Sequence, residues 1–325
     1  MIKNRRKLAA RISAAAMLLC LLLGLCACSA PQAEPAQGEK LKVVTTIFPP
    51  YDFARQLGGN LVEVTMLAAP GTEAHDFVPT LTDVDALAQC DLFLYVGGTT
   101  DAWAQSALES LGDAAPRAVA MCDLVDTVEE QPLEGMEPEH GEHGEDETDE
   151  HVWTSPRNAI AICQGIAAAM QELDPDNRAA YAAGCGRYCS QLETLDQAFA
   201  EVMAGSVRRT VVFADRFPFR YLADELGLTC YAAFAGCSSD TEPSLATLAF
   251  LTEKVQSERL PVVFYVEFSD QTLADTICAA TGAQKLLLHS CHNVSPEEFA
   301  AGVTYLDLMN RNVENLRTAV QTASP

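Results

Sequence analysis

The chain is 325 residues long and carries 21 basic and 45 acidic side chains, a formal net charge of −24. Its length predicts two domains of about 100–150 residues each, and its 49% apolar content is too high for a disordered chain. The acidic balance argues against nucleic-acid binding, because neutralising phosphates requires clustered Lys and Arg. The single long apolar run lies at the N-terminus, so a polytopic membrane protein is excluded.

The N-terminus has the features of an export signal. Residues 1–27 combine five basic side chains, a central apolar stretch and small residues before Cys28, which is typical of a secretory signal peptide. The Leu-Cys-Ala-Cys segment that ends at Cys28 resembles a bacterial lipobox, in which the cysteine becomes the lipidated first residue of the mature chain. We expect Cys28 to be lipidated, with Cys26 or an uncleaved membrane anchor as alternatives. Residues 28–40 have the composition of a flexible tether.

From residue 41 onward, short β-rich runs alternate with helical segments. This alternation predicts parallel sheets covered by helices. We expect strands at 42–48, 62–67, 92–96 and 118–121, and helices at 51–57, 84–89 and 102–111. Residues 41–155 are therefore predicted to form an N-terminal α/β lobe.

A break in composition follows at residues 123–150, which hold 13 acidic side chains and no Lys or Arg. Such a segment cannot form a core, so we expect a solvated loop or a disordered insertion. It includes His140 and His143. One interpretation is that it concentrates cations beside a nearby site and raises their association rate; the other is that it only adds solubility.

Two helices are expected in the middle of the chain, over residues 158–173 and 176–204. In the second, apolar side chains recur at alternating spacings of four and three from Tyr181 to Val202, which indicates one apolar face. A helix of that length would span about 43 Å, enough to run from one domain to the next. Residues 156–204 are therefore expected to link the two lobes.

The second half repeats the alternation and predicts a C-terminal α/β lobe over residues 205–325. Strands are expected at 210–214, 229–234, 262–267 and 285–289, and helices at 219–226, 245–256, 271–281 and 304–320. The expected fold class is α/β with two lobes, each a mostly parallel sheet flanked by helices, joined by a long backbone helix.

Four of the six histidines lie outside the acidic segment: His75, His151, His289 and His292. His75 follows a predicted strand, His151 lies where the acidic segment meets a helix, and His289 ends a strand of the second lobe. Ligands of open α/β sheets bind outside the carboxyl ends of the strands, so these three are candidates for one metal site. Imidazole suits zinc, and carboxylates widen the choice toward manganese. Alternatively, His151 only begins a helix and His289 is a buried, hydrogen-bonded side chain.

At these residues the sequence resembles the cluster A-I solute-binding proteins of zinc and manganese ABC importers, over residues 42–320. Residues 71–80 (GTEAHDFVPT), which contain His75, are similar to the family's G-x-x-x-H-x-x-x-P-T motif. Residues 149–158 (DEHVWTSPRN), which contain His151, are similar to D-x-H-x-W-x-x-P-x-N. The acidic stretch just before them resembles the family's metal-rich loop.

The resemblance implies a monomeric receptor, exported and lipid-anchored to the bacterial cell membrane. Such a receptor captures zinc between its lobes and delivers it to an ABC permease, without enzymatic activity. Manganese-specific binding and metal-dependent surface adhesion are the alternatives. An exported zinc hydrolase is disfavoured, because the chain contains neither H-E-x-x-H nor G-x-S-x-G.

The resemblance also implies His75 and His151 as ligands from the first lobe. The family usually has a His in an H-x-A-x-G-Y segment that opens the second lobe, whereas the corresponding segment here, DRFPFRY, contains none. We therefore expect His289 to supply the missing nitrogen and Asp215 or Glu267 to complete the site. Three imidazoles would favour zinc over manganese.

Overall fold

The computed structural model describes residues 39–73, 75, 77–130, 132–136, 148–236 and 243–322. The expected signal peptide, the lipidation at Cys28 and the two histidines of the acidic segment, His140 and His143, lie outside these residues. The chain divides into residues 1–40 and 41–325, and the following description concerns the second unit. None of the described helices is long and apolar enough to cross a membrane.

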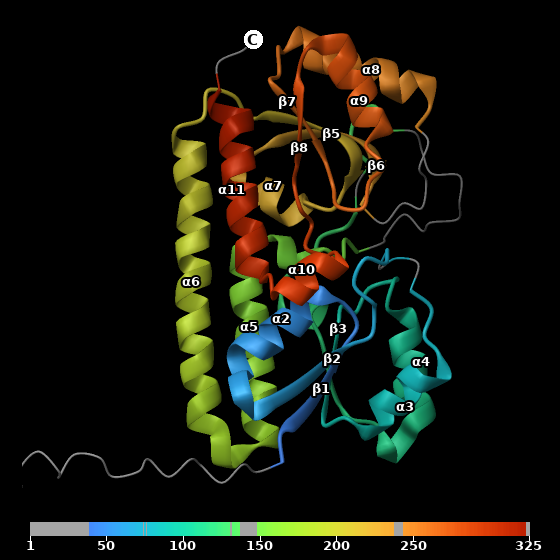
Figure 1. The fold of residues 1–325 in the computed structure, drawn as a ribbon, viewed down its shortest axis with the longest axis vertical. Helices are drawn as coiled ribbons and strands as arrows, with labels where there is room; N and C mark the ends of the chain where they lie inside the picture. The colour runs from blue at the N-terminus through green and yellow to red at the C-terminus, as the bar shows by residue number, and fades with distance from the viewer. Residues whose placement is uncertain are drawn as a thin grey trace, which may run out of the picture. The chain divides into compact units, whose positions relative to one another are not determined.

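The first lobe is built on a parallel sheet of four strands in the order β2-β1-β3-β4 (Figure 1). Its elements are β1 (Leu41–Thr45), α2 (Phe48–Gly58), β2 (Val62–Met66), α3 (Leu81–Gln89), β3 (Leu92–Tyr95), α4 (Ala102–Leu111) and β4 (Arg117–Ala120). Val43 of β1 pairs with Val64 of β2 and with Leu92 of β3. Because all four strands are parallel, their carboxyl ends meet at one edge, where the loop to α3 begins.

The second lobe repeats this plan with the strand order β6-β5-β7-β8, again all parallel. Its elements are β5 (Thr210–Phe217), α7 (Arg220–Leu226), β6 (Thr229–Ala235), α8 (Leu245–Ser257), β7 (Val262–Tyr265), α9 (Thr272–Thr281), β8 (Gln284–Leu287), α10 (Pro296–Ala301) and α11 (Tyr305–Gln321). Strand β5 is three residues longer than predicted and changes register between Phe213 and Arg216. The predicted strand 210–214 would have placed Asp215 just after its end, whereas in the structure Asp215 lies within β5.

Helices α5 (Pro156–Leu173) and α6 (Arg178–Ala204) lie between the two sheets in sequence and connect the lobes. Figure 1 shows α6 running alongside both lobes, and it packs against α2 of the first lobe and α11 of the second. Its predicted apolar face is buried, and at Gly184 an added Cβ would collide with the carbonyl oxygen of Leu57. Two parallel sheets with a long connecting helix confirm the predicted fold class.

Short 3-10 helices complete the described elements: η1 (Gly59–Leu61), η3 (Gly112–Ala114), η4 (Cys122–Leu124), η5 (Val152–Thr154) and η6 (Pro175–Asn177).

The described part of the acidic segment 123–150 is anchored to the protein, which corrects the expectation that this part is a solvated loop. Apolar side chains between the acids pack against the main core: Leu124, Val125, Val128, Leu133 and Met136. The Val128 N–H donates to the Tyr221 hydroxyl (3.3 Å), and the Thr247 hydroxyl donates to the Gly135 carbonyl (3.0 Å). The segment is thereby attached to the second lobe, because the apolar residues spaced among its acids supply packing that a count of charges does not reveal.

Candidate metal centre

Three imidazoles from different parts of the chain meet between the lobes. His75 precedes α3, His151 caps η5, and His292 lies in the loop between β8 and α10. The ring centroids are 5.5 Å apart for His75 and His151, 4.4 Å for His75 and His292, and 5.3 Å for His151 and His292. One ligand atom of each residue lies within 4.8 Å of the others. The structure therefore brings together the two histidines predicted for the first lobe and joins to them an imidazole from the second.

His151 is completely buried and held by one carboxylate. Its Nδ1 is 3.0 Å from Oδ1 of Asp149, and the same oxygen accepts the His151 main-chain N–H at 2.9 Å. Its Nε2 is buried and has no hydrogen-bond partner among the described residues. When Nδ1–H donates to Asp149, Nε2 presents a lone pair to the other two rings, as a metal-binding histidine does.

His75 is oriented through a hydroxyl. Its Nδ1 lies 3.1 Å from the Thr100 hydroxyl oxygen, and that hydroxyl donates to Oε1 of Glu150 at 2.9 Å. Because the hydroxyl proton goes to Glu150, the oxygen is free to accept from Nδ1–H of His75, which leaves Nε2 as the available ligand. The Glu150 carboxylate also accepts the Thr100 N–H at 3.0 Å and the Thr99 hydroxyl at 2.8 Å, and the residue is 2% exposed.

The local electrostatics keep two of the rings neutral. Burial, together with the nearby His151 and Arg216, lowers the pKa of His75 to about 3. Burial also lowers the pKa of His292 well below its usual value, and His75, His151 and Arg216 act in the same direction. A neutral imidazole is the form that binds metal, so these two rings are ready as ligands at neutral pH.

The third ring is influenced in the opposite direction. Burial opposes protonation of His151, but the hydrogen bond to Asp149 and the charges of Asp149, Glu150 and Glu130 outweigh it, so its pKa is raised. The negative charges that favour a proton on this ring also favour a metal cation beside it. His151 is therefore the member of the triad at which protons compete most directly with metal.

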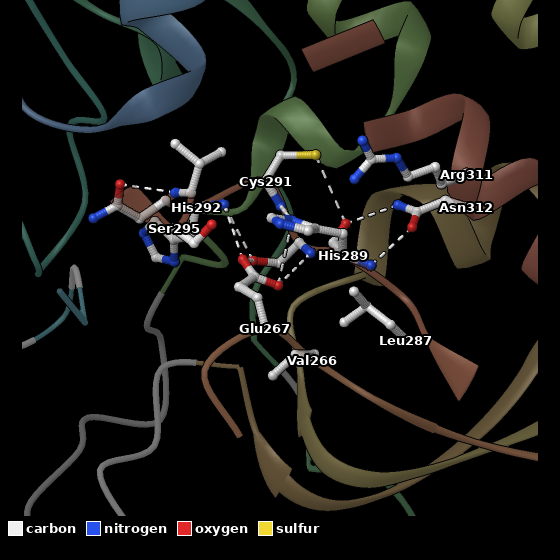
Figure 2. Close-up of polar contacts among 12 residues, drawn as sticks. Val266, Glu267, Leu287, His289, Cys291, His292, Ser295, Arg311 and Asn312 are labelled. Atoms are coloured by element: carbon white, nitrogen blue, oxygen red, sulfur yellow. Dashed lines mark hydrogen bonds and ion pairs between the residues drawn. The ribbon is translucent and has the colours of Figure 1, made fainter. Parts of the chain in front are cut away.

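Glu267 organises the loop that carries His292 (Figure 2). Its carboxylate accepts the main-chain N–H groups of Ser290 (2.8 Å) and His292 (3.2 Å), and also the Ser290 hydroxyl. The Trp153 indole N–H donates to the Ser290 carbonyl at 2.8 Å, and the Trp153 ring lies 4.9 Å from the His292 ring. Cys291, which lies between Ser290 and His292 in the chain, has a φ of 64°, which is uncommon for a residue other than glycine. Hydrogen bonds from Glu267 and from Trp153 thus hold the loop in one conformation.

His289 lies three residues earlier in the same loop, and its ring is not part of the triad. Its Nδ1 accepts the Cys291 N–H at 2.9 Å and lies 3.5 Å from Oε2 of Glu267. The Asn312 side chain binds the His289 main chain twice, accepting its N–H at 2.8 Å and donating to its carbonyl at 2.7 Å (Figure 2). This is the buried, hydrogen-bonded arrangement that the sequence left open as the alternative for His289. His292, and not His289, is the third imidazole of the cluster with His75 and His151.

The two predicted carboxylates differ in position. Asp215 accepts the N–H groups of Arg216 (2.9 Å) and Val266 (3.2 Å), and burial raises its pKa. It does not line the hollow beside the imidazoles, which has an empty volume of about 330 Å³ including open solvent. Glu267 does line it, as do Arg216 and Glu73. Arg216 and Glu73 form an ion pair across the lobes, with 3.0 Å between the guanidinium and the carboxylate.

One family model and several known proteins match this chain. The family model of the zinc-uptake complex component A, periplasmic (ZnuA), matches residues 43–319. The zinc-binding lipoprotein AdcA of Streptococcus pneumoniae (strain ATCC BAA-255 / R6) is 31% identical over 317 residues, which are 97% of this chain and 62% of the relative. The chain thus spans less than two thirds of that relative's length.

Two further comparisons cover their counterparts almost completely. The high-affinity zinc uptake system protein ZnuA of Bacillus subtilis (strain 168) is 31% identical over 311 residues, 94% of this chain and 95% of the relative. The crystal structure of the Zn(II)-bound ZnuA-like domain of S. pneumoniae AdcA has a TM-score of 0.73 and 28% identity, and the match covers 87% of this chain and 100% of that domain.

Proposed function

The chain belongs to the ZnuA family of zinc-uptake components, and from this premise we propose that it is the extracytoplasmic receptor of an ABC importer. It captures zinc between its two lobes and delivers the ion to a membrane permease. The observation that carries the proposal is the triad of His75, His151 and His292, whose ligand atoms lie within 4.8 Å of one another. The zinc named in the relatives' descriptions supports the choice of metal.

His75, His151 and His292 each bind the ion through one ring nitrogen. His75 and His151 use Nε2, because Nδ1 of each ring is engaged by Thr100 or Asp149. Three nitrogen ligands favour zinc over manganese, which prefers a larger share of oxygen ligands. Glu267 and Asp215 contribute by fixing loops, since their oxygens are occupied by main-chain N–H groups.

The receptor role accounts for the rest of the chain. Residues 1–27 direct export, Cys28 carries the lipid, and residues 28–40 tether the two lobes to the outer face of the cell membrane. One chain supplies all three imidazoles, so a monomer suffices. The family is one of solute-binding receptors and not of enzymes, and ion capture needs no activated water. Surface adhesion stays a prediction, because nothing in the site tests it.

Metal analysis and competition titration of the soluble chain from Ser29 onward test the proposal, with zinc and manganese in parallel. We expect one tightly bound zinc per chain and weaker binding of manganese. The variants His75→Ala, His151→Ala and His292→Ala should each lose tight binding, whereas His289→Gln should keep it. Tight binding by His292→Ala together with its loss in His289→Gln would show that the ligand assignment is wrong.

A further inference from the structure

Three imidazoles leave a tetrahedral zinc ion one ligand short. Two carboxylates line the hollow beside the triad, Glu73 from the first lobe and Glu267 from the second. Asp215 lies outside that lining. If the proposed zinc-binding function holds, Glu73 and Glu267 are therefore the candidates for the fourth ligand.

Glu267 is committed to the loop that carries His292. One of its oxygens accepts the Ser290 hydroxyl and the His292 N–H, and the other accepts the Ser290 N–H. Turning this carboxylate toward the ion would leave the Ser290 N–H and hydroxyl without this acceptor, at a cost of about 1–3 kcal/mol for each, and would leave the His292 N–H with the Ser290 hydroxyl oxygen (3.2 Å) alone. The same turn would release the loop that positions the His292 ring, so Glu267 is better suited to hold a ligand than to be one.

Glu73 has the opposite character. It lies two residues before His75 on the same loop, and its Oε2 accepts from the Arg216 guanidinium at 3.0 Å. Among the described residues its carboxylate makes no other polar contact, and the side chain is 27% exposed. A carboxylate accepts on both oxygens, so Oε1 is available to a cation while Oε2 remains on Arg216.

The loop that carries Glu73 is pinned next to the second lobe. The Asn293 side-chain amide donates to the carbonyls of Ala69 (2.8 Å) and Thr72 (2.9 Å), and the Gly71 N–H donates to the Val294 carbonyl (2.7 Å). Asn293 and Val294 directly follow His292. The main chain preceding Glu73 and the main chain following His292 are thus joined, which keeps the Glu73 side chain beside the triad without requiring the lobes to move.

We propose that Glu73 is the fourth zinc ligand and that Arg216 positions it by holding the carboxylate oxygen that does not bind the ion. In this structure the group of ligand atoms within 4.8 Å contains the three imidazoles alone, so the Glu73 side chain turns when the ion is captured.

The test compares Glu73→Gln with Glu63→Gln, an exposed carboxylate on β2 that undergoes the same loss of charge. Zinc affinity is measured by competition titration of the soluble chain, and the ligand field by the visible absorption of Co²⁺ in the same site. We expect Glu73→Gln to bind zinc at least about 10- to 100-fold more weakly, since mutating a group that only supports a metal ligand already lowers the affinity by that factor. Its Co²⁺ spectrum should change, and Glu63→Gln should match the wild type in both.

The positioning role of Arg216 has its own readout. Arg216→Met should weaken zinc binding and alter the Co²⁺ spectrum, Arg216→Lys should recover most of both, and adding Arg216→Met to Glu73→Gln should have little further effect. Tighter binding by Arg216→Met would mean that the guanidinium only repels the ion, which overturns the positioning role. A wild-type affinity and spectrum in Glu73→Gln would overturn the fourth ligand, whereas a wild-type chain that binds no zinc would overturn the proposed function itself.

Discussion

The hydrogen bond between Asp149 and His151 offers the sharpest test of how the site is built. Asp149 is 2% exposed and His151 is 0% exposed, and one carboxylate oxygen binds both the ring Nδ1 (3.0 Å) and the main-chain N–H (2.9 Å). In Asp149→Asn, the charge that favours a cation on or beside the ring is lost. A hydrogen bond to a charged group is worth about 1.5–3 kcal/mol, which corresponds to a roughly 10- to 100-fold weaker zinc affinity.

Competition titration with a chromogenic zinc chelator measures this loss directly. The control is Asp126→Asn, an exposed aspartate of the same acidic segment with the same change of charge, and we expect it to bind zinc as the wild type does. If Asp149→Asn keeps the wild-type affinity, the carboxylate does not set the tautomer of His151, and the assignment of Nε2 as the ligand atom is refuted.

Three other predictions follow from residues outside the triad. Burial is the largest cause that raises the pKa of Asp101 from 3.8 to about 6, and the charge of Glu150 adds to it. Between pH 4 and 6 the folded state therefore keeps a proton that the unfolded state has lost. The free energy of unfolding should then fall by up to about 3 kcal/mol as the pH rises from 4 to 6. Urea unfolding of the metal-free chain should show a smaller decrease over this range for Asp101→Asn than for the wild type. Gly184→Val should lower the free energy of unfolding by about 2 kcal/mol or more, and with it the urea midpoint, because the added Cβ would collide with the Leu57 carbonyl. The control is Gly186→Val, where an added Cβ meets nothing within 4 Å, and it should show only the smaller effect of helix propensity. Deleting residues 137–147 should slow zinc association at low concentration and low salt in stopped-flow measurements while leaving the equilibrium affinity unchanged; an unchanged association rate would favour a purely solubilising segment.

The alternation of apolar runs and helical periodicity was sufficient to predict the fold, because those patterns are local. Helix α4 has the predicted bounds, Ala102–Leu111, and α6 ends at Ala204 as predicted. The strand ends were predicted less well. β8 ends at Leu287 and not at His289, because the His289 main chain leaves the sheet to bind the Asn312 side chain of α11.

The same contact explains why the sequence favoured His289 over His292. Which of two histidines three residues apart faces the other lobe depends on the path of the loop between β8 and α10. That path is determined by Asn312, by Glu267 and by the positive φ of Cys291. Two of these are side chains that lie at least 23 residues along the chain from the loop residues they bind, and no local pattern reports their contacts. His75 and His151, in contrast, were identified by motifs that contain the ligand itself.

The three rings are oriented by three unrelated sets of contacts, and this bears on how the proposed receptor achieves affinity. Asp149 holds His151, Thr100 holds His75, and Glu267 with Trp153 holds the loop of His292. The conformational entropy of ordering the ligands is thus lost during folding and not when the ion binds, so each coordination bond contributes more fully to affinity. By the same argument, release to a permease requires that at least one ring be moved from its partner. His75 is the least buried of the three, and among the described residues its ring nitrogens have one hydrogen-bond partner, the neutral Thr100 hydroxyl. Its loop is therefore the part of the site that a permease would displace at the lowest cost.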